Sequence, residues 1–194
     1  MHTYANTGWI EVIVGCMESG KTEELRRRVR RALIAGKRIA AFVYAPKDAE
    51  VAPFRVTTRD GRSLSAVPVS STHEIRNAVR EAIEVVAIDE IHFFEDDIVD
   101  LLHELADSGR EVIVAGLDQD FRGRAFGPMG RLLAEAEVVD KLYAICAQCH
   151  GRASRTQKLV NGRPAAMGSP TVETNKTARY EPRCRACHMV PEES

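Results

Sequence analysis

The sequence lacks any apolar run that could cross a membrane. No window of about 18 residues is both uncharged and apolar throughout, as a transmembrane helix requires. The amino-terminal segment, MHTYANTGW, also lacks the charged region and following apolar core of a secretory signal. We therefore expect a cytoplasmic protein with no membrane partner.

An excess of charge of one sign is also missing. The chain carries 27 Lys and Arg against 28 Asp and Glu, a formal net charge of -1. This balance provides no overall field that would attract nucleic acid, so a small or neutral substrate is expected. One basic cluster consists of Arg26, Arg27, Arg28, Arg30 and Arg31. Because Glu23 and Glu24 precede it, we interpret it as a solvated or subunit-facing surface.

Cysteine is scarce, and its spacing indicates a metal site. Four of the five cysteines form two CxxC pairs: Cys146 with Cys149, and Cys184 with Cys187. Without a secretory signal, such pairs indicate metal ligands before disulfides. Four thiolates close a tetrahedron around Zn²⁺ and leave no place for water, so the predicted zinc site is structural. His150 and His188 are alternative ligands, and a redox dithiol is the other alternative.

The rest of the chain alternates β-branched runs with helical patterns. Strands are expected at residues 9–14, 38–44, 85–88 and 111–116, and helices at 21–35, 71–83 and 96–107. Ser71 and Glu74 form a capping box for the second helix, and residues 46–70 indicate an irregular excursion with short strands. This alternation predicts an α/β fold, with a mostly parallel sheet flanked by helices.

A change of composition divides the chain. Residues 1–145 carry the α/β pattern, whereas residues 146–194 are enriched in Cys, Arg, Gly and Pro. We therefore predict an α/β domain at 1–145 and a small zinc-binding domain at 146–194. The first domain has the size of an ordinary globular unit.

Residues 15–22, GCMESGKT, match the phosphate-binding pattern GxxxxGK[ST]. In such a loop, successive backbone N–H groups surround phosphate oxygens at the start of a helix. The predicted phosphate-binding residues are Gly15, Cys16, Met17, Glu18, Ser19, Gly20, Lys21 and Thr22. Lys21 would meet the β and γ phosphates, and the Thr22 hydroxyl would bind Mg²⁺. A glycine-bearing turn without a ligand is the alternative.

Two carboxylates follow the third predicted strand. Asp89 and Glu90 stand at its carboxyl end, where open α/β sheets bind ligands. Asp89 suits Mg²⁺. Glu90 could position water in a hydrolase, accept a hydroxyl proton in a kinase, or only cap the next helix. With Ile91 and His92 they complete the predicted nucleotide-binding residues.

The motifs GCMESGKTEELRRRVRR, AIDEIHFF, AGLDQDFRGRAFGPM, RTQKLVNGRPA and YEPRCRACH, taken together, resemble those of type II thymidine kinases, the family that includes the human cytosolic enzyme. The resemblance covers most of the chain from Trp9 to His188. It implies a P-loop domain of the RecA-like type with a zinc-bound lasso that closes over the nucleoside. It also implies transfer of the ATP γ-phosphoryl group to the thymidine 5′-hydroxyl, a homotetramer, and inhibition by thymidine triphosphate.

The resemblance also implies roles for particular residues. Glu90 matches the general base, while Lys21, Thr22 and Asp89 match the phosphate and Mg²⁺ positions. The implied nucleoside contacts are Met17, Phe93, Phe121, Phe126, Thr156, Thr171, Val172, Glu173, Thr174, Asn175 and Tyr180. A neutral nucleoside requires such an apolar or aromatic pocket, a base beside its hydroxyl and a lid against water.

The sequence departs from the family pattern at four places. Cys16 replaces the usual Pro, Glu18 an aromatic residue and His92 a Gln, and residues 173–176 (ETNK) lack the usual Gly-Gly. A kinase of another deoxynucleoside is therefore one alternative. The DEIH segment at 89–92 also fits a DExH-type nucleic-acid-dependent ATPase, although such motors need a second lobe. The third alternative is a zinc-ribbon binding module on a regulatory P-loop domain.

Overall fold

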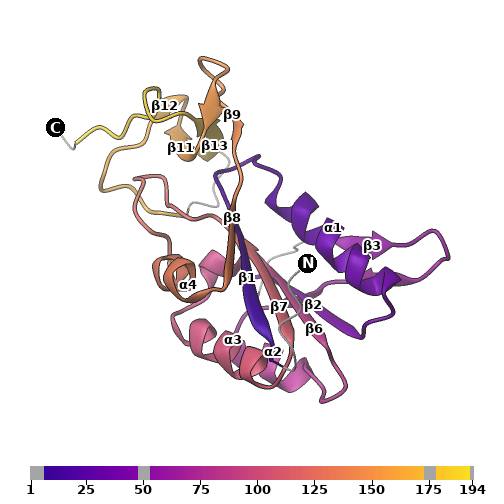
Figure 1. The fold of residues 1–194 in the computed structure, drawn as a ribbon. Coiled ribbons are helices and arrows are strands. Elements are labelled where there is room, and N and C mark those ends of the chain that lie inside the picture. Colours follow the sequence, from indigo (N-terminus) through magenta and orange to yellow (C-terminus); the bar gives the residue numbers. More distant parts are fainter. Residues whose placement is uncertain (1–6, 48–52, 173–177, 193–194) are drawn as a thin grey trace.

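A six-stranded parallel sheet forms the centre of the protein (Figure 1). We analysed a computed structural model, which describes residues 7–47, 53–172 and 178–192. Across the sheet the strands are β5 (Val67–Val69), β2 (Ile39–Tyr44), β6 (Val85–Asp89), β7 (Glu111–Gly116), β1 (Trp9–Val14) and β8 (Val138–Lys141). Every neighbouring pair in this order is parallel, which confirms the predicted fold class.

Helices cover both faces of the sheet, because its central strands are apolar on both sides (Figure 1). On one face, α1 (Lys21–Ile34) and the hairpin of β3 (Arg55–Thr57) and β4 (Ser63–Ser65) pack on Ile13, Ala87 and Ile113. The other face packs against α2 (Thr72–Ala78), α3 (Asp97–Asp107) and α4 (Met129–Glu135). The predicted apolar side of α3 is confirmed, since Ile98, Leu101, Leu102 and Leu105 are all buried.

The second predicted helix is shorter than expected. Ser71 caps α2 as predicted, because its hydroxyl accepts the Glu74 N–H at 3.4 Å. The predicted extension to residue 83 is wrong: α2 ends at Ala78, and Val79 is extended. Glu84 is fixed between the neighbouring strands by backbone bonds to Arg38 and Glu111, so the chain must leave the helix early enough to reach them.

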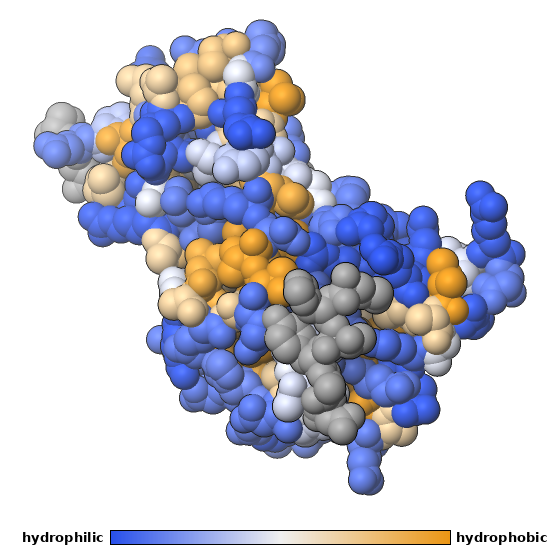
Figure 2. Space-filling view, in the orientation of Figure 1, coloured by the Kyte–Doolittle hydropathy of each residue, from blue (hydrophilic) through white to orange (hydrophobic). Residues whose placement is uncertain are grey.

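Residues after β8 form a smaller lobe beside the carboxyl end of the sheet (Figure 1). It contains two small antiparallel sheets. One pairs β9 (Ala144–Ile145) with β10 (Arg152–Ala153), and the other orders β12 (Arg163–Pro164), β11 (Arg155–Val160) and β13 (Ala178–Arg183). Figure 2 shows this lobe standing out from the sheet domain, with hydrophilic side chains over much of the visible face.

In the described part of the chain, no helix combines the length and apolar character that a membrane crossing requires.

Candidate active site

The phosphate loop connects β1 to α1, and two of its glycines are required by its geometry. A Cβ on Gly15 would lie 2.5 Å from Ser19 Oγ and 2.7 Å from the Leu142 carbonyl oxygen, closer than real contacts allow. Gly20, immediately before α1, has φ of 85° in the left-handed region, where a side chain is strained. The strand, loop and helix that the motif predicts are therefore all present.

Within the loop, polar groups are aimed inward. Lys21 Nζ donates to the Cys16 carbonyl oxygen at 2.8 Å, and burial lowers the Lys21 pKa. Among the described residues, Ser19 Oγ is buried without a hydrogen-bond partner. An anion with several oxygens, such as a phosphate, would accept from both the ammonium and the hydroxyl.

The carboxyl end of β6 meets the start of α1 at Thr22. The Thr22 hydroxyl donates to Asp89 Oδ2 at 2.9 Å, although Thr22 and Asp89 are far apart in the sequence. Asp89 is buried, and this burial raises its pKa against the opposing effect of the Thr22 hydrogen bond. The structure therefore joins two residues that the motifs alone could only place on separate segments.

Glu90 stands directly after β6 in a conformation that is unusual for a glutamate. Its φ and ψ are 58° and 36°, in the left-handed region, and its N–H donates to Asp89 Oδ1 at 3.0 Å. The side chain is 42% exposed, and desolvation by the surrounding protein raises the Glu90 pKa to about 7. Asp89 raises it further, whereas Lys21 opposes the shift. A carboxylate with such a pKa is suited to exchanging a proton near neutral pH.

Beyond Glu90, η1 (Ile91–Phe93) begins an aromatic cluster. The rings of Phe93 and Phe126 meet edge to face with centroids 5.6 Å apart, and His92 contacts both. Both phenylalanines are half-buried. Ile91 is fully buried in the core. Phe121 is also buried and lies under the Arg122 guanidinium, 4.3 Å from the ring centroid.

The smaller lobe contacts the phosphate loop directly. The Met17 N–H donates to Thr156 Oγ1 on β11 at 3.1 Å, and the Cys16 thiol donates to the Ala153 carbonyl oxygen at 3.5 Å. Burial raises the Cys16 pKa, which keeps the thiol protonated. Cys16 also packs with Cys146 in one buried apolar cluster. The departure from proline at Cys16 thus adds a hydrogen bond between the two lobes.

A polar anchor fixes the segment at 167–171. Arg122 donates to the carbonyl oxygens of Met167, at 2.8 Å, and of Ser169, and also to Thr171 Oγ1, at 2.8 Å. The buried Lys158 donates to the Pro170 carbonyl oxygen at 2.6 Å. We call this set of contacts the Arg122 anchor. The sequence did not predict the Arg122 anchor; only the presence of Arg122 in the DQDFRG motif pointed to a role for this residue.

The anchored segment leads towards the remaining predicted nucleoside contacts. Tyr180 on β13 donates to the Thr171 carbonyl oxygen at 3.2 Å, and Val172 is half-exposed. The predictions for Glu173, Thr174 and Asn175 fall outside the described residues. Their roles stay predictions.

The four paired cysteines come together as their spacing predicts. Their sulfur atoms all lie within 4.8 Å of one another, and the Cys149 and Cys184 sulfurs are 3.6 Å apart. Four thiolates about 2.3 Å from a tetrahedral Zn²⁺ are separated by about 3.8 Å, so the cluster could hold zinc. His188 instead contacts the Phe121 carbonyl oxygen at 2.8 Å.

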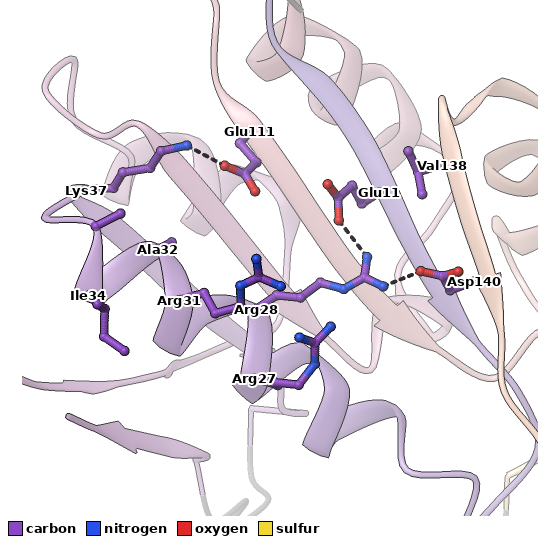
Figure 3. Close-up of a pocket in the computed structure, with 11 residues that line it drawn as sticks. Glu11, Arg27, Arg28, Arg31, Ala32, Ile34, Lys37, Glu111, Val138 and Asp140 are labelled. Atoms are coloured by element: carbon purple, nitrogen blue, oxygen red, sulfur yellow. Dashed lines mark hydrogen bonds and ion pairs between the residues drawn. The ribbon is translucent and has the colours of Figure 1, made fainter. Parts of the chain in front are cut away.

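A groove of about 560 Å³ lies elsewhere, between α1 and the strands β7, β1 and β8 (Figure 3). Its residues come from the carboxyl half of α1 and from positions such as Glu111 and Val138, where strands begin. It is therefore at the opposite end of the sheet from the phosphate loop. Arg28 donates across it to Glu11 at 2.6 Å and to Asp140. The predicted basic cluster is thus partly neutralised by acidic residues.

A phosphate loop beside an acidic strand end is the arrangement with which P-loop proteins bind nucleoside triphosphates and transfer their terminal phosphoryl group. The fold and the site therefore define a protein of the P-loop nucleotide-binding class. A family model described as thymidine kinase matches residues 8–188, most of the chain. The chain belongs to the thymidine kinase family. It is accordingly a kinase of the nucleoside type that uses ATP.

Proposed function

We propose that this protein transfers the γ-phosphoryl group of ATP to the 5′-hydroxyl of thymidine, giving thymidine monophosphate and ADP. The observation that carries the proposal is Glu90, a carboxylate with a pKa near 7 beside Lys21 and the phosphate loop. Family membership supports a nucleoside as the acceptor. The proposed physiological role is pyrimidine deoxynucleoside salvage.

In the proposed reaction, the loop N–H groups and Lys21 bind the ATP phosphates. Glu90 takes the proton of the nucleoside 5′-hydroxyl while the oxygen of that hydroxyl forms a bond to the γ-phosphorus. The bond between that phosphorus and the β,γ-bridging oxygen breaks, and ADP leaves with that electron pair. Lys21 lies close enough to Glu90 to favour its carboxylate form, which is the form that accepts the proton.

Thr22 and Asp89 are the proposed Mg²⁺ positions. Their two oxygens are 2.9 Å apart, the separation of neighbouring ligands in an octahedron with Mg–O distances of about 2.1 Å. A bound Mg²⁺ would neutralise charge on the phosphate oxygens. The Thr22 hydroxyl and the Asp89 carboxylate fit this cation because both are hard oxygen donors.

The nucleoside is proposed to bind between the aromatic cluster and the smaller lobe. Phe93 and Phe126 offer half-buried ring surface, and Met17 and Thr156 come from opposite sides of the contact between the lobes.

We further propose the division into a P-loop domain at 1–145 and a zinc-binding lasso domain at 146–194. A homotetramer, feedback by thymidine triphosphate and a cytoplasmic location remain expectations from the resemblance.

A nucleoside panel tests the acceptor. The protein is incubated with Mg²⁺, ATP and each deoxynucleoside, and monophosphates are separated by chromatography. We expect thymidine to give the fastest product formation. Faster phosphorylation of another nucleoside would identify that nucleoside, and not thymidine, as the preferred substrate. ATP hydrolysis stimulated by nucleic acid, without any nucleoside monophosphate, would instead establish the DExH-type alternative.

Glu90→Gln tests the base. The amide cannot accept the proton, so kcat should fall by about 100-fold or more while ATP binding changes little. The matched control is Glu81→Gln, because Glu81 is exposed and lies at the opposite end of β6. A Glu90→Gln enzyme with the kcat of the wild type would exclude Glu90 as the base.

A further inference from the structure

His92 lies between the ends of two strands, with its ring fully enclosed. Only 1% of the residue is exposed. Its Nδ1 accepts the backbone N–H of Leu117, which follows β7, at 3.1 Å. Gly116 makes this approach possible, because a Cβ there would lie 3.0 Å from Nδ1 and 2.9 Å from Ile91 Cγ2. The position of the ring is thus set by the backbone at the end of β7.

The Leu117 contact also determines where the ring carries its proton. Burial lowers the His92 pKa to about 3, so the ring is neutral at physiological pH. A neutral imidazole has one donor and one acceptor nitrogen. Since Nδ1 is the acceptor for Leu117, Nε2 must be the donor.

That donor points towards the proposed base. Among the described residues, Nε2 is buried without a hydrogen-bond partner, and Glu90 Oε2 lies 3.6 Å from it. The separation exceeds hydrogen-bonding range by a few tenths of an ångström. Catalytic contacts are often long in structures without substrate and shorten when substrate binds. The rings of Phe93 and Phe126, at centroid distances of 4.1 and 4.7 Å, keep the imidazole from turning away.

We propose that His92 is a positioning residue for Glu90, whose carboxylate accepts a hydrogen bond from His92 Nε2 when the site closes on its substrates. The inference rests on the proposed role of Glu90 as base. The contact links Glu90 through one rigid ring to the backbone N–H of Leu117, directly after β7. It would hold one carboxylate oxygen and leave the other directed at the acceptor hydroxyl.

A hydrogen bond from His92 Nε2 would fix the Glu90 carboxylate, which no backbone contact of Glu90 does. Glu90 is 42% exposed at its side chain, and its N–H, rather than its carboxylate, is bonded to Asp89. A base that is free to rotate spends less time within reach of the hydroxyl proton, and misplacement by about 1 Å can cost 100-fold in rate. Positioning by His92 should therefore affect kcat more than substrate binding.

Two substitutions test the roles of the two ring nitrogens separately. The Asn side chain in His92→Asn can place its oxygen near Nδ1 and keep the Leu117 bond, but it has no group at the Nε2 position. The longer Gln side chain in His92→Gln can place its amide nitrogen near Nε2 and restore the donor. The pair therefore tests the donor towards Glu90 apart from the structural acceptor.

We expect His92→Asn to lower kcat for thymidine by about tenfold or more with KM for ATP changed by less than about threefold, and His92→Gln to recover most of the rate. Thermal unfolding must show native folding of both variants. A native His92→Asn enzyme with wild-type kcat would overturn the proposal. Equal loss in both native variants would also overturn it, because the donor would then not be the relevant group.

The double variant Glu90→Gln with His92→Asn tests whether His92 acts through Glu90. If it does, His92→Asn should reduce the residual rate of Glu90→Gln far less than it reduces the wild-type rate. Independent, multiplying losses contradict the proposal. A Glu90→Gln enzyme that is fully active on its own contradicts the proposed function instead, so the two failures are distinguishable.

A measurement on the wild-type protein covers the case in which a variant does not fold. The ¹H resonance of His92 Nε2–H, assigned by ¹⁵N-histidine labelling, should move downfield when thymidine and a non-hydrolysable ATP analogue bind together. Glu90→Gln should reduce that movement. A resonance that is unaffected by substrates in the wild type rejects the hydrogen bond.

Discussion

At the scale of single residues, the pKa values of Glu90 and of the buried His92 are shifted in opposite directions. Burial raises the pKa of Glu90 to about 7 and lowers the pKa of His92 to about 3. In both cases the neutral form is favoured, because the surroundings solvate charge poorly. Glu90 lies next to Lys21, which opposes part of its shift, whereas Lys21 adds to the shift of His92.

The low pKa of His92 predicts that acid destabilises the fold. An unfolded histidine has a pKa of about 6.5, so between about pH 6.5 and 3 the unfolded chain binds a proton that the folded chain does not. Stability therefore rises with pH through this window and is fully present above it. Between pH 7.5 and 5.5, His92 alone should remove about 1.4 kcal/mol from the free energy of unfolding.

Urea unfolding of the wild type and His92→Gln at both pH values measures this effect. Subtracting the two pH dependences removes contributions from the other titrating groups. We expect the wild type to lose about 1.4 kcal/mol more than His92→Gln on acidification. Equal losses in the two proteins would mean that His92 does not titrate differently on folding.

How far single residues can be predicted depends on whether their partners are near in sequence. The roles proposed for Lys21, Thr22 and Glu90 come from short patterns whose chemistry is local. The tautomer of His92 was not predictable, because it depends on the N–H of Leu117, which is distant in sequence and follows β7. Lys158 gave no signal either: a lysine on a short strand is normally exposed, and its burial depends on the Pro170 carbonyl oxygen.

At the scale of elements, the strands predicted correctly are those with long apolar runs, such as β1 and β7. Each is buried over most of its length, so the sequence pattern is strong. The edge strand β8 and the short helix α4 were not predicted. Three of the four residues of β8 are exposed, and α4 has only seven residues, so neither shows a clear periodicity.

The Arg122 anchor predicts a specific effect on nucleoside binding. Arg122→Met keeps much of the side-chain length but removes the hydrogen bonds that Arg122 donates to Met167, Ser169 and Thr171. The segment at 167–171 ends at Thr171, whose carbonyl oxygen accepts a hydrogen bond from Tyr180. In Arg122→Met, part of the free energy of nucleoside binding would be needed to order this segment. We expect KM for thymidine to rise about tenfold or more with kcat changed much less.

Steady-state kinetics with varied thymidine at saturating ATP measures this effect. Arg124→Met is the matched control, because Arg124 is exposed and only two residues away. Limited proteolysis should also cut Arg122→Met faster within residues 165–172. An unchanged KM together with unchanged proteolysis would show that Arg122 does not hold the segment.

At the scale of the whole molecule, the two lobes meet at the phosphate loop itself. The loop residues Cys16 and Met17 donate to Ala153 and Thr156 of the smaller lobe. The same lobe contains the four-cysteine cluster, and Cys146 of that cluster packs with Cys16. The predicted zinc site and the proposed ATP site are therefore connected through directly packed residues.

This connection predicts that disrupting the four-cysteine cluster weakens ATP binding, even though its cysteines lie outside the phosphate loop. A metal bound at such a cluster would contribute to the folding of a small lobe with few buried residues. When the smaller lobe loosens, the hydrogen bonds from Met17 and Cys16 are lost. Part of the free energy of ATP binding is then needed to order the phosphate loop, so the affinity for ATP falls. We expect Cys149→Ser, at the most exposed cysteine of the cluster, to raise the Kd for ATP by about tenfold.

Calorimetry of ATP binding and hydrogen exchange of the loop measure the two halves of this effect. Exchange should accelerate at residues 15–22 and 144–160 in Cys149→Ser, but stay slow in the central strands β6 and β7, which are buried in the sheet core. Val12→Ala provides the contrast, since it perturbs β1 from the core and leaves the lobe contacts in place. Loss of zinc with native exchange and native ATP affinity at the loop would mean that the lobes are energetically independent, and that the Cys16 and Met17 contacts contribute nothing to nucleotide binding.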